Sequence, residues 1–455
     1  MASSKTMDLT EGPILNKMLR FAVPIILGNL LQQLYTAADR VVVGRFAADG
    51  ATALAAIGVT VSPLNLLIGF FVGIATGNNV ICANFLGAKN HKDLRKSMHT
   101  SVLMGLIAGV SLCVLGALAS PMMLAWMNTP ADVIDQALLY MRIYFLGVPA
   151  SLLYNIASGI LRAHGDTKRP MYILMISGLL NVALNLVFVV FAHMDVAGVA
   201  VATILSQYMS AIASLWIMFS PKDQYKLTVK EMRIDKKQMM AVIRIGVPSG
   251  LGSMVFSASN IVVQTAMNSF DSAAVIAGKA AATDINSMVY QIQAGVYAAC
   301  VSFAGQCFGA KKYKRIDKVA TTATAVCVIS MGTCAVLCAI FASQLVGLFN
   351  ADPNVVKYGS TMLRINTLGI IVYTPAEIYL GCSRGMRRAM APTMLNMIAV
   401  CGVRILWVLL VFPMNPTVSM LYYCFPISWA VSSILQFSYY CYIRKKLDKQ
   451  EIQSA

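Results

Sequence analysis

Twelve long apolar runs dominate the sequence, and they limit what the chain can fold into. A helix needs about 20 mostly apolar residues to cross the hydrocarbon core of a bilayer. Because lipid offers the backbone no hydrogen bonds, a single segment of this length crosses only as a helix. We expect spans at 18–43, 54–82, 97–120, 133–161, 170–192, 196–219, 241–268, 276–306, 319–343, 356–382, 391–413 and 418–442. The sequence therefore predicts an all-α integral membrane protein whose immediate partner is the lipid bilayer.

Composition and charge agree with this prediction. Hydrophobic residues make up 58% of the chain and charged residues only 12%, whereas soluble proteins carry about 25% charged residues. The net charge of +17 is of the kind that can indicate nucleic-acid binding. Here, however, the basic residues lie in short clusters between the apolar runs, which is the topology signal of a membrane protein. We therefore expect no nucleic-acid partner.

The same basic clusters predict the orientation of the chain. Most of the 36 basic residues lie at the termini or in alternate connections, and positive loops stay in the cytoplasm. The basic residues that are embedded or outside are Arg40, Arg45, Arg142, Lys279, Lys357, Arg364 and Arg404. The other loops carry the acids Asp49, Asp132, Asp135, Asp195, Asp271 and Asp352. We expect a multi-pass protein of the cell (inner) membrane with both termini in the cytoplasm.

The two halves of the chain repeat each other at a nearly fixed offset in the numbering. Gly87 matches Gly309 (309 − 87 = 222), and Arg142-Ile143, Gly147, Gly159, Arg162 and Pro170 have counterparts at the same offset. Val23-Pro24 matches Val247-Pro248 at an offset that is larger by two. This predicts a six-helix bundle over 1–220, a cytoplasmic linker over 221–240 and a second bundle over 241–455. Six spans per half make the repeat parallel, and we expect a central cleft, a transporter function and activity as a monomer.

Several short motifs give the chain a resemblance to a known family. They are Val23-Pro24 followed by Asp39, Gly87-Ala88-Lys89, Gly159-Ile160-Leu161-Arg162-Ala163, Gly165-Asp166-Thr167-Lys168, Leu180-Asn181, Asn185 and Ala202-Thr203. Together with the twelve spans and the repeat, they make the chain similar to the multidrug and toxic compound extrusion (MATE) family over its whole length. The resemblance implies a secondary antiporter without an organic cofactor, which expels lipophilic cationic drugs in exchange for Na⁺ or H⁺.

Asp39 is the main candidate for ion coupling. A charged side chain at the centre of a span costs about 2.5–3.5 kcal/mol on insertion scales, so it needs a reason to be there. Polar residues, among them Gln33 and Tyr35, lie close to Asp39 in the sequence. A carboxylate buried among them could bind a sodium ion or take up a proton. The alternative is a salt bridge to Arg40 or to a neighbouring helix.

The resemblance supplies partners for Asp39, namely Asn181, Asn185 and Thr203. The two asparagines are four residues apart and so share a helix face. Some family members have Asp at the position of Asn185, so this chain has one carboxylate fewer, which leaves both ions open. The alternative role of the two asparagines is interhelical hydrogen bonding.

The second half contributes the candidates for cargo binding. Its membrane acids are Asp284 and Glu377, and aromatic faces attract cations, so we group them with Tyr290 and Tyr373, and with Tyr35 and Gln33 of the first half, as substrate-binding candidates. Glu377 could instead pair with Arg404, and Asp284 with Lys279. The tyrosines could also be ordinary core residues.

Two other functions fit the sequence less well. A lipid-linked precursor flippase of the same superfamily would need a cleft rich in arginine and lysine, whereas the embedded charges here are mixed. A membrane-embedded enzyme would need a catalytic constellation. The four histidines lie at loops or span ends, and neither HExxH nor GxSxG occurs. We therefore expect a transporter and not an enzyme.

Overall fold

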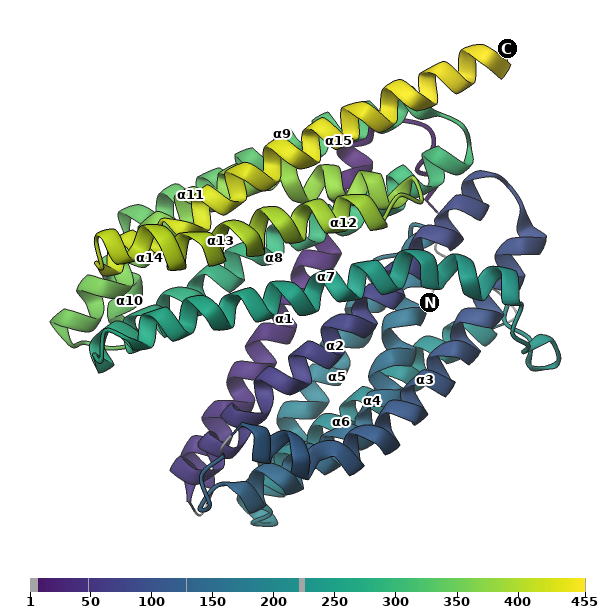
Figure 1. The fold of residues 1–455 in the computed structure, drawn as a ribbon. Helices are drawn as coiled ribbons and strands as arrows, with labels where there is room; N and C mark the ends of the chain where they lie inside the picture. Colours follow the sequence, from purple (N-terminus) through teal and green to yellow (C-terminus); the bar gives the residue numbers. More distant parts are fainter. Residues whose placement is uncertain (1–6, 48, 128, 221–225, 455) are drawn as a thin grey trace. The chain divides into compact units, whose positions relative to one another are not determined.

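The computed structural model describes residues 7–47, 49–127, 129–220 and 226–454, and over these ranges the chain is helical with no strand (Figure 1). Residues 1–6 of the predicted first bundle and residues 221–225 of the predicted linker lie outside the described residues.

The first half consists of six long helices. They are α1 (Ile14–Phe46), α2 (Gly50–Gly87), α3 (His91–Trp126), α4 (Ile134–Ala163), α5 (Lys168–Asn185) with its π-helical continuation η1 (Leu186–Phe191), and α6 (Asp195–Phe219). A short 3-10 turn, η2 (Val229–Glu231), follows.

The second half repeats this pattern with more interruptions. Its elements are α7 (Lys236–Asn268), α8 (Ala273–Gly309), α9 (Tyr313–Ile340), α10 (Ala342–Gly347), α11 (Pro353–Gly385), α12 (Met390–Met397), η3 (Ile398–Gly402), α13 (Val403–Leu406), η4 (Trp407–Val411), η5 (Phe412–Met414), α14 (Val418–Tyr422) and α15 (Cys424–Ser454). The stretch from α12 to η5 is one continuous span, as is the stretch from α14 into α15.

The predicted spans are confirmed as helices. Each of the twelve lies on one of these long helical stretches, and most of the helices extend a few residues beyond the apolar run. Polar caps account for part of this extension. At the start of α2, Asp49 accepts a hydrogen bond from the Thr52 N–H at 3.1 Å, and at the start of α3, Asn90 Oδ1 accepts one from the Asp93 N–H at the same distance. By length and composition alone, ten of the described helices could cross a membrane. The two others, α8 and α11, have 37 and 33 residues but carry more polar side chains.

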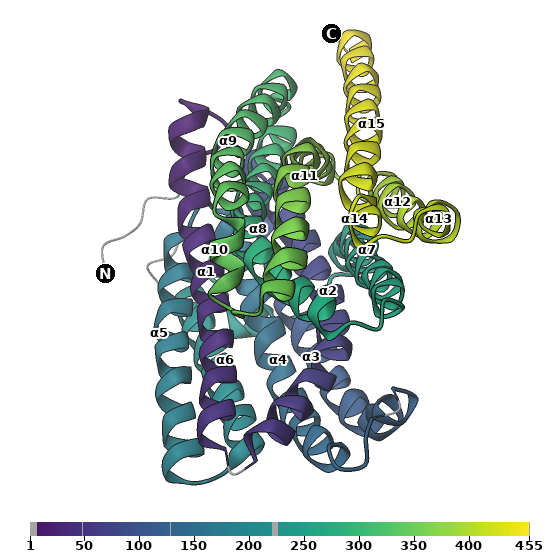
Figure 2. The ribbon, with the colours of Figure 1, turned by 90° about the vertical axis from the view of Figure 1, so that its left-hand side faces the viewer.

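Contacts divide the described residues into two compact units. Unit 1 comprises residues 7–8 and 23–250, and unit 2 comprises residues 9–22 and 251–454. In unit 1, α4 packs against α2, α3 and α6, and Figure 2 shows α3, α4 and α6 running side by side. In unit 2, α11, which occupies the same place in the repeat, packs against α8, α9 and α15. Each unit is therefore organised around its fourth helix.

Polar contacts explain why the first turns of α1 belong to unit 2. The Leu9 N–H donates to Gln306 Oε1 at 2.9 Å, and Arg315 donates to the carbonyl oxygens of Leu9, Glu11 and Gly12. Leu9 itself is fully buried. Residues 9–12 are therefore held by the end of α8 and the start of α9.

The first turns of α7 are held in unit 1 by a similar set of bonds. The Asp235 N–H donates to Thr100 on α3 at 3.0 Å, and the Asp235 carboxylate accepts the N–H groups of Lys237 and Gln238. The Gln238 N–H bond, followed by the weaker effects of Lys237 and Lys96, holds the pKa of Asp235 below its ordinary value. Asp235 thus caps α7 and fixes its start against α3.

The backbone repeats as well as the sequence. Lys89 and Lys311, which correspond to each other in the repeat, both adopt left-handed conformations, with φ of 54° and 56°. Gly165 and Arg387, a second corresponding pair, have φ of 82° and 60°. The turns after the second and the fourth helix of each half are therefore built in the same way, which confirms a parallel repeat.

Glycines bring α2 and the first half of α7 into backbone contact within unit 1. Gly73 and Gly77 on α2 face Gly250 and Gly246 on α7. On each helix the two glycines are four residues apart, a spacing that lets membrane helices approach closely. A Cβ on Gly77 would lie 2.6 Å from the Val242 carbonyl oxygen, and one on Gly246 would lie 2.7 Å from the Ile74 Cα. Neither backbone can move aside as a flexible side chain could.

We therefore expect Gly77→Ala to lower the thermal stability of the detergent-purified protein, because the added methyl meets backbone atoms. Overpacking of this kind costs about 1–3 kcal/mol. Gly58→Ala, on the same helix with nothing within 4 Å of the new Cβ, is the matched control and should leave the melting temperature unchanged or raise it. Equal losses of melting temperature in the two variants would contradict the close helix contact.

Candidate functional site

Three helices of unit 1 bring the predicted ion-coupling residues together. Asp39 comes from α1, Asn181 and Asn185 come from successive turns of α5, and Thr203 comes from α6. Asn185 Nδ2 donates to Asp39 Oδ1 and lies 3.4 Å from Asn181 Oδ1, while Asn181 Nδ2 lies 3.5 Å from Thr203 Oγ1. The four side chains form one connected polar chain, which we call the Asp39 cluster.

The Asp39 cluster leaves part of its bonding capacity unused. Asn185 is fully buried, and its Oδ1 has no hydrogen-bond partner in the part of the chain that is described. Asp39 is half-buried and makes no ion pair with any described residue, and Arg40 is exposed. The alternative of a structural salt bridge at Asp39 is therefore not what the structure contains. A carboxylate and a free amide oxygen are hard ligands of the kind that alkali and alkaline-earth ions take.

Tyr35 fixes α1 against α5 one turn before Asp39. Its hydroxyl donates to the Met175 carbonyl oxygen at 3.1 Å, and its ring covers Gly178, where any Cβ would overlap the ring atoms. Residues four apart share a helix face, so this contact also directs Asp39 towards α5. Gln33 is half-buried, and no described contact joins it to the cluster.

The π-helix η1 starts directly after Asn185. Short π segments within α-helices occur often at functional sites, because the extra residue per turn re-aims the side chains around it. In this chain η1 ends the regular part of α5 at the Asp39 cluster. Sequence patterns do not reveal this change, since the apolar run continues through it.

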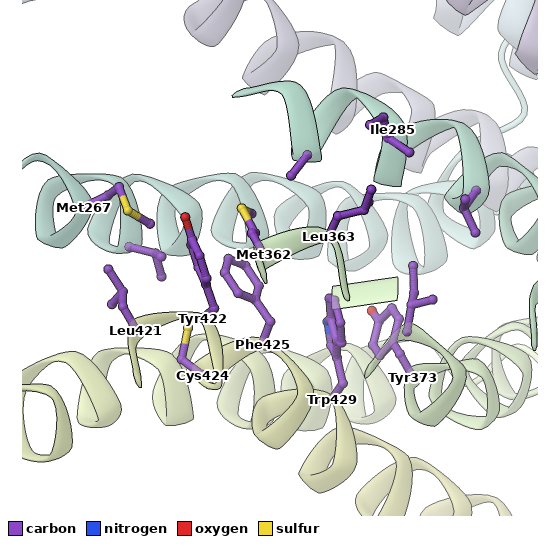
Figure 3. Close-up of a cluster of buried hydrophobic side chains, with 14 of the residues drawn as sticks. Met267, Ile285, Met362, Leu363, Tyr373, Leu421, Tyr422, Cys424, Phe425 and Trp429 are labelled. Atoms are coloured by element: carbon purple, nitrogen blue, oxygen red, sulfur yellow. The ribbon is translucent and has the colours of Figure 1, made fainter. Parts of the chain in front are cut away.

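Glu377 and Tyr373 are brought together in unit 2. The Tyr373 hydroxyl donates to Glu377 Oε1 at 2.6 Å across one turn of α11. The Tyr373 ring is buried, with its centroid 5.7 Å from that of Trp429 on α15. Figure 3 shows these two rings next to each other in the apolar cluster of unit 2. A carboxylate beside aromatic rings is a suitable environment for an organic cation.

The other two cargo candidates lie on α8. Tyr290 is 37% exposed and the Asp284 side chain is exposed. No ion pair joins Asp284 to Lys279 among the described residues, because Lys279 donates to Gln264 on α7 instead. The structure gives neither Asp284 nor Tyr290 a hydrogen bond to Glu377.

Arg404 is the embedded charge with the most unusual surroundings. It is 0% exposed, yet no acid pairs with it among the described residues, so the alternative pair with Glu377 is not formed. Its Nε donates to Ser428 Oγ at 3.3 Å, and its Nη1 donates to Ser259 Oγ at 3.2 Å and to Asn260 Oδ1 at 2.9 Å. The guanidinium also lies over the rings of Phe425, Phe256 and Trp429 at 4.6, 5.2 and 6.0 Å.

The local helix geometry places Arg404 at this position. It lies in the four-residue α13, between the π segments η3 and η4. The sequence indicated Arg404 as an embedded base with Glu377 as one possible partner. The serines and aromatic residues that surround it come from α7 and α15, so spacing along the sequence could not have indicated them.

Comparison with known proteins places these observations in a family. The MatE family model matches residues 24–187 and again residues 248–410, so it covers most of both halves and agrees with the internal repeat.

The relatives match over most of their length. The probable multidrug resistance protein YoeA of Bacillus subtilis is 27% identical over 97% of this chain and 96% of its own. The probable multidrug resistance protein NorM of Thermotoga maritima is 22% identical over 87% of this chain and 85% of its own. An FAD transporter of Shewanella oneidensis is 21% identical over 80% and 82%.

Solved structures share the fold. A MATE protein crystallised with the ligand MaL6 superposes with a TM-score of 0.92 at 20% identity and covers 98% of this chain and 100% of its own. A MOP superfamily transporter from Pyrococcus furiosus, described as having a binding pocket of reverse polarity, has the same TM-score at 19% identity and the same coverage. With the family model matched over both halves, the chain belongs to the MatE family of multi-pass membrane transporters.

Proposed function

We propose that this transporter is a secondary active multidrug exporter, which expels lipophilic organic cations in exchange for Na⁺ or H⁺ by alternating access. Two of the relatives described above are named as probable multidrug resistance proteins. As a MatE transporter the chain is not an enzyme, which removes the membrane-enzyme alternative. The proposal also places the protein in the cell (inner) membrane with both termini in the cytoplasm, in line with the distribution of basic residues between its loops.

The observation that carries the coupling proposal is the incomplete bonding of the Asp39 cluster. A buried polar oxygen without a partner costs about 1–3 kcal/mol, and such groups in native structures often mark a function or an unoccupied ligand position. Here the unpartnered oxygen, Asn185 Oδ1, belongs to the side chain that holds Asp39. A sodium ion or a proton bound at Asp39 would neutralise the carboxylate and remove the charge that Asn185 now stabilises.

Neutralisation at Asp39 would act on α1 through Tyr35. Tyr35 and Asp39 are the two described side chains that bond α1 to α5 near this site. A change in the charge of Asp39 therefore alters one of the two bonds and leaves the other as a pivot. We propose that this is how the coupling ion changes the packing of α1.

Cargo binding is assigned to Glu377 and Tyr373 in unit 2, with Tyr290 and Asp284 on the neighbouring α8 as weaker contributors. The Glu377 carboxylate supplies the charge that attracts a cation, and the Tyr373 and Trp429 rings supply an aromatic surface. The absence of an ion pair between Glu377 and Arg404 leaves the carboxylate available for this purpose. No organic cofactor takes part in the proposed cycle.

Asp39→Asn is expected to lower the rate of ion-driven ethidium efflux from proteoliposomes in which a sodium gradient and a pH gradient are applied separately. A hydrogen bond to a charged group is worth about 1.5–3 kcal/mol, which corresponds to a loss of roughly tenfold to a hundredfold. The gradient that drives efflux in the wild type identifies the ion. Asp132→Asn, at an exposed acid of the same unit, is the matched control and should transport normally. Unchanged efflux in Asp39→Asn would remove Asp39 from the mechanism.

Thr203→Val separates ion binding from interhelical hydrogen bonding, because it removes one oxygen and hardly alters the volume. If Thr203 helps to bind the coupling ion, the ion concentration that half-saturates efflux should rise several-fold. Thr36→Val removes an exposed hydroxyl that bonds only to the Gln32 carbonyl of its own helix, and it should leave that concentration unchanged. A fall in melting temperature without any change in ion dependence would instead assign Thr203 to helix packing alone.

Glu377→Gln should weaken cargo binding without altering the ion that drives transport. We expect the half-saturating ethidium concentration to rise by roughly tenfold, since about 1.4 kcal/mol of attraction is lost, while efflux at saturating dye keeps its dependence on the gradient. Tyr373→Phe, which removes only the hydroxyl that donates to Glu377, should have a smaller effect. If both variants bind ethidium as the wild type does, the cargo site lies elsewhere.

A further inference from the structure

Arg404 lies next to Val403, the position in unit 2 that corresponds to Asn181 of the Asp39 cluster. The repeat described above aligns α5 with the span from α12 to η5, α6 with the span from α14 into α15, and α1 with α7. The corresponding positions are Val182 and Arg404, Thr203 and Phe425, and Thr36 and Asn260. The same three helices of each half therefore meet at a carboxylate in unit 1 and at a guanidinium in unit 2.

The surroundings of Arg404 have more donors than acceptors. Arginine carries five N–H groups in a fixed planar fork, and the three bonds to Ser428, Ser259 and Asn260 use only Nε and Nη1. Nη2 is buried and has no partner among the described residues. The indole Nε1 of Trp429, the residue whose ring lies 6.0 Å from the guanidinium, is also buried and without a partner. Both unused groups can only donate.

No acid compensates for this surplus. Glu377 is the one acid of α11, and it makes no ion pair with Arg404. The second embedded base of the unit, Lys279 on α8, is also without an acidic partner in the described ranges. A buried charge in a protein is normally paired. The group that would pair with Arg404 therefore carries a single negative charge and accepts hydrogen bonds.

We propose that unit 2 binds a monovalent anion at Arg404, with Arg404 Nη2 and Trp429 Nε1 as its donors. Two ligands share this chemistry: a halide ion, and the carboxylate of a small aromatic acid. The positive edges of the aromatic rings around the guanidinium favour an anion in the ring plane. Asn260, which holds Nη1, is exposed at the surface of the unit, so the site lies within one side chain of the exterior.

The position of the aromatic rings also provides a probe for the site. Figure 3 shows Phe425 and Trp429 on the same helix of the apolar cluster, with Tyr373 beside Trp429. Trp429 is only 8% exposed, whereas Trp126, which lies beyond the end of the predicted third span, is 75% exposed. Iodide quenches indole fluorescence on contact, so it should quench Trp126 in proportion to its concentration and Trp429 only through a bound ion.

The experiment measures tryptophan fluorescence of the full purified chain while potassium iodide replaces potassium sulfate, whose anion is divalent, at constant ionic strength. We expect a saturable quenching component in the wild type that is absent in Trp429→Phe. Arg404→Gln should weaken the component by at least roughly tenfold, the equivalent of about 1.4 kcal/mol. Arg364→Gln, at an exposed arginine of the same unit that bonds to the Ala339 carbonyl, is the matched control and should keep the component.

Benzoate distinguishes the two ligands. If it displaces iodide and restores the fluorescence, the site accepts carboxylates; if it does not, the site selects halides, and either result supports an anion site. Purely linear quenching in the wild type would overturn the proposal, as would a saturable component that survives in folded Arg404→Gln. Should Arg404→Gln not yield monodisperse protein, Arg404→Lys, which keeps the charge and loses the planar fork, should show weakened binding. None of these measurements involves drug efflux, so the anion site stands or falls separately from the proposed exporter function.

Discussion

Hydrocarbon cannot solvate a polar group, and the internal structure of both units follows from this constraint. Each embedded side chain with hydrogen-bonding capacity must find its partner within the protein. Lys279 therefore bonds to Gln264, Tyr35 bonds to the backbone of α5, and Arg404 is surrounded by serines, an amide and three aromatic rings. The same requirement makes the exceptions informative. Where a buried group keeps an unused donor or acceptor, packing alone does not explain it.

The two units use one architecture with opposite charges. In each, the fourth helix is central and the same turns adopt left-handed conformations. The first helix of each half is divided between the two units. The difference lies where the first, fifth and sixth helices of each half meet. Unit 1 has Asp39 with amide and hydroxyl oxygens there, and unit 2 has Arg404. The local backbone differs as well, because Arg404 lies between two π segments whereas the corresponding span of unit 1 has one, η1.

The sequence predicted the helices well and the contacts unevenly. Span positions follow from hydropathy and from the alternation of basic loops, both of which are local signals that the bilayer imposes. The π segments η1, η3 and η4 could not be predicted, because an apolar run has the same sequence pattern whether it forms an α-helix or a π-helix. The position of residues 9–22 in unit 2 could not be predicted either, since it depends on Gln306 and Arg315, which lie in the other half of the chain.

The candidate site shows the same division between what could and what could not be predicted. Asp39 could be selected from the sequence because a carboxylate in an apolar run is rare, but its bond to Asn185 came only from the family resemblance. Arg404 was recognised as an embedded base, while its pairing with Glu377 was only one of two alternatives, and the structure contains no such pair. The solvation of a buried charge depends on all the helices around it, and here neutral groups and ring faces hold Arg404 in place of an acid while its Nη2 stays without a partner.

Unused bonding capacity has a thermodynamic consequence for a transporter. A fully satisfied polar cluster stabilises one packing of its helices, whereas a cluster that lacks one partner is stabilised further when a ligand supplies it. The gain is RT ln(1 + [L]/Kd) and depends on the concentration of that ligand. In unit 1 the deficit is of positive charge, at Asp39 and Asn185 Oδ1; in unit 2 it is of negative charge, at Arg404 Nη2 and Trp429 Nε1. A ligand that binds one conformation of such a unit more tightly than another shifts the balance between them by that difference in affinity and by no more. Under the two proposals, the incomplete clusters are the places where a bound ion would shift the balance between packings of the helices.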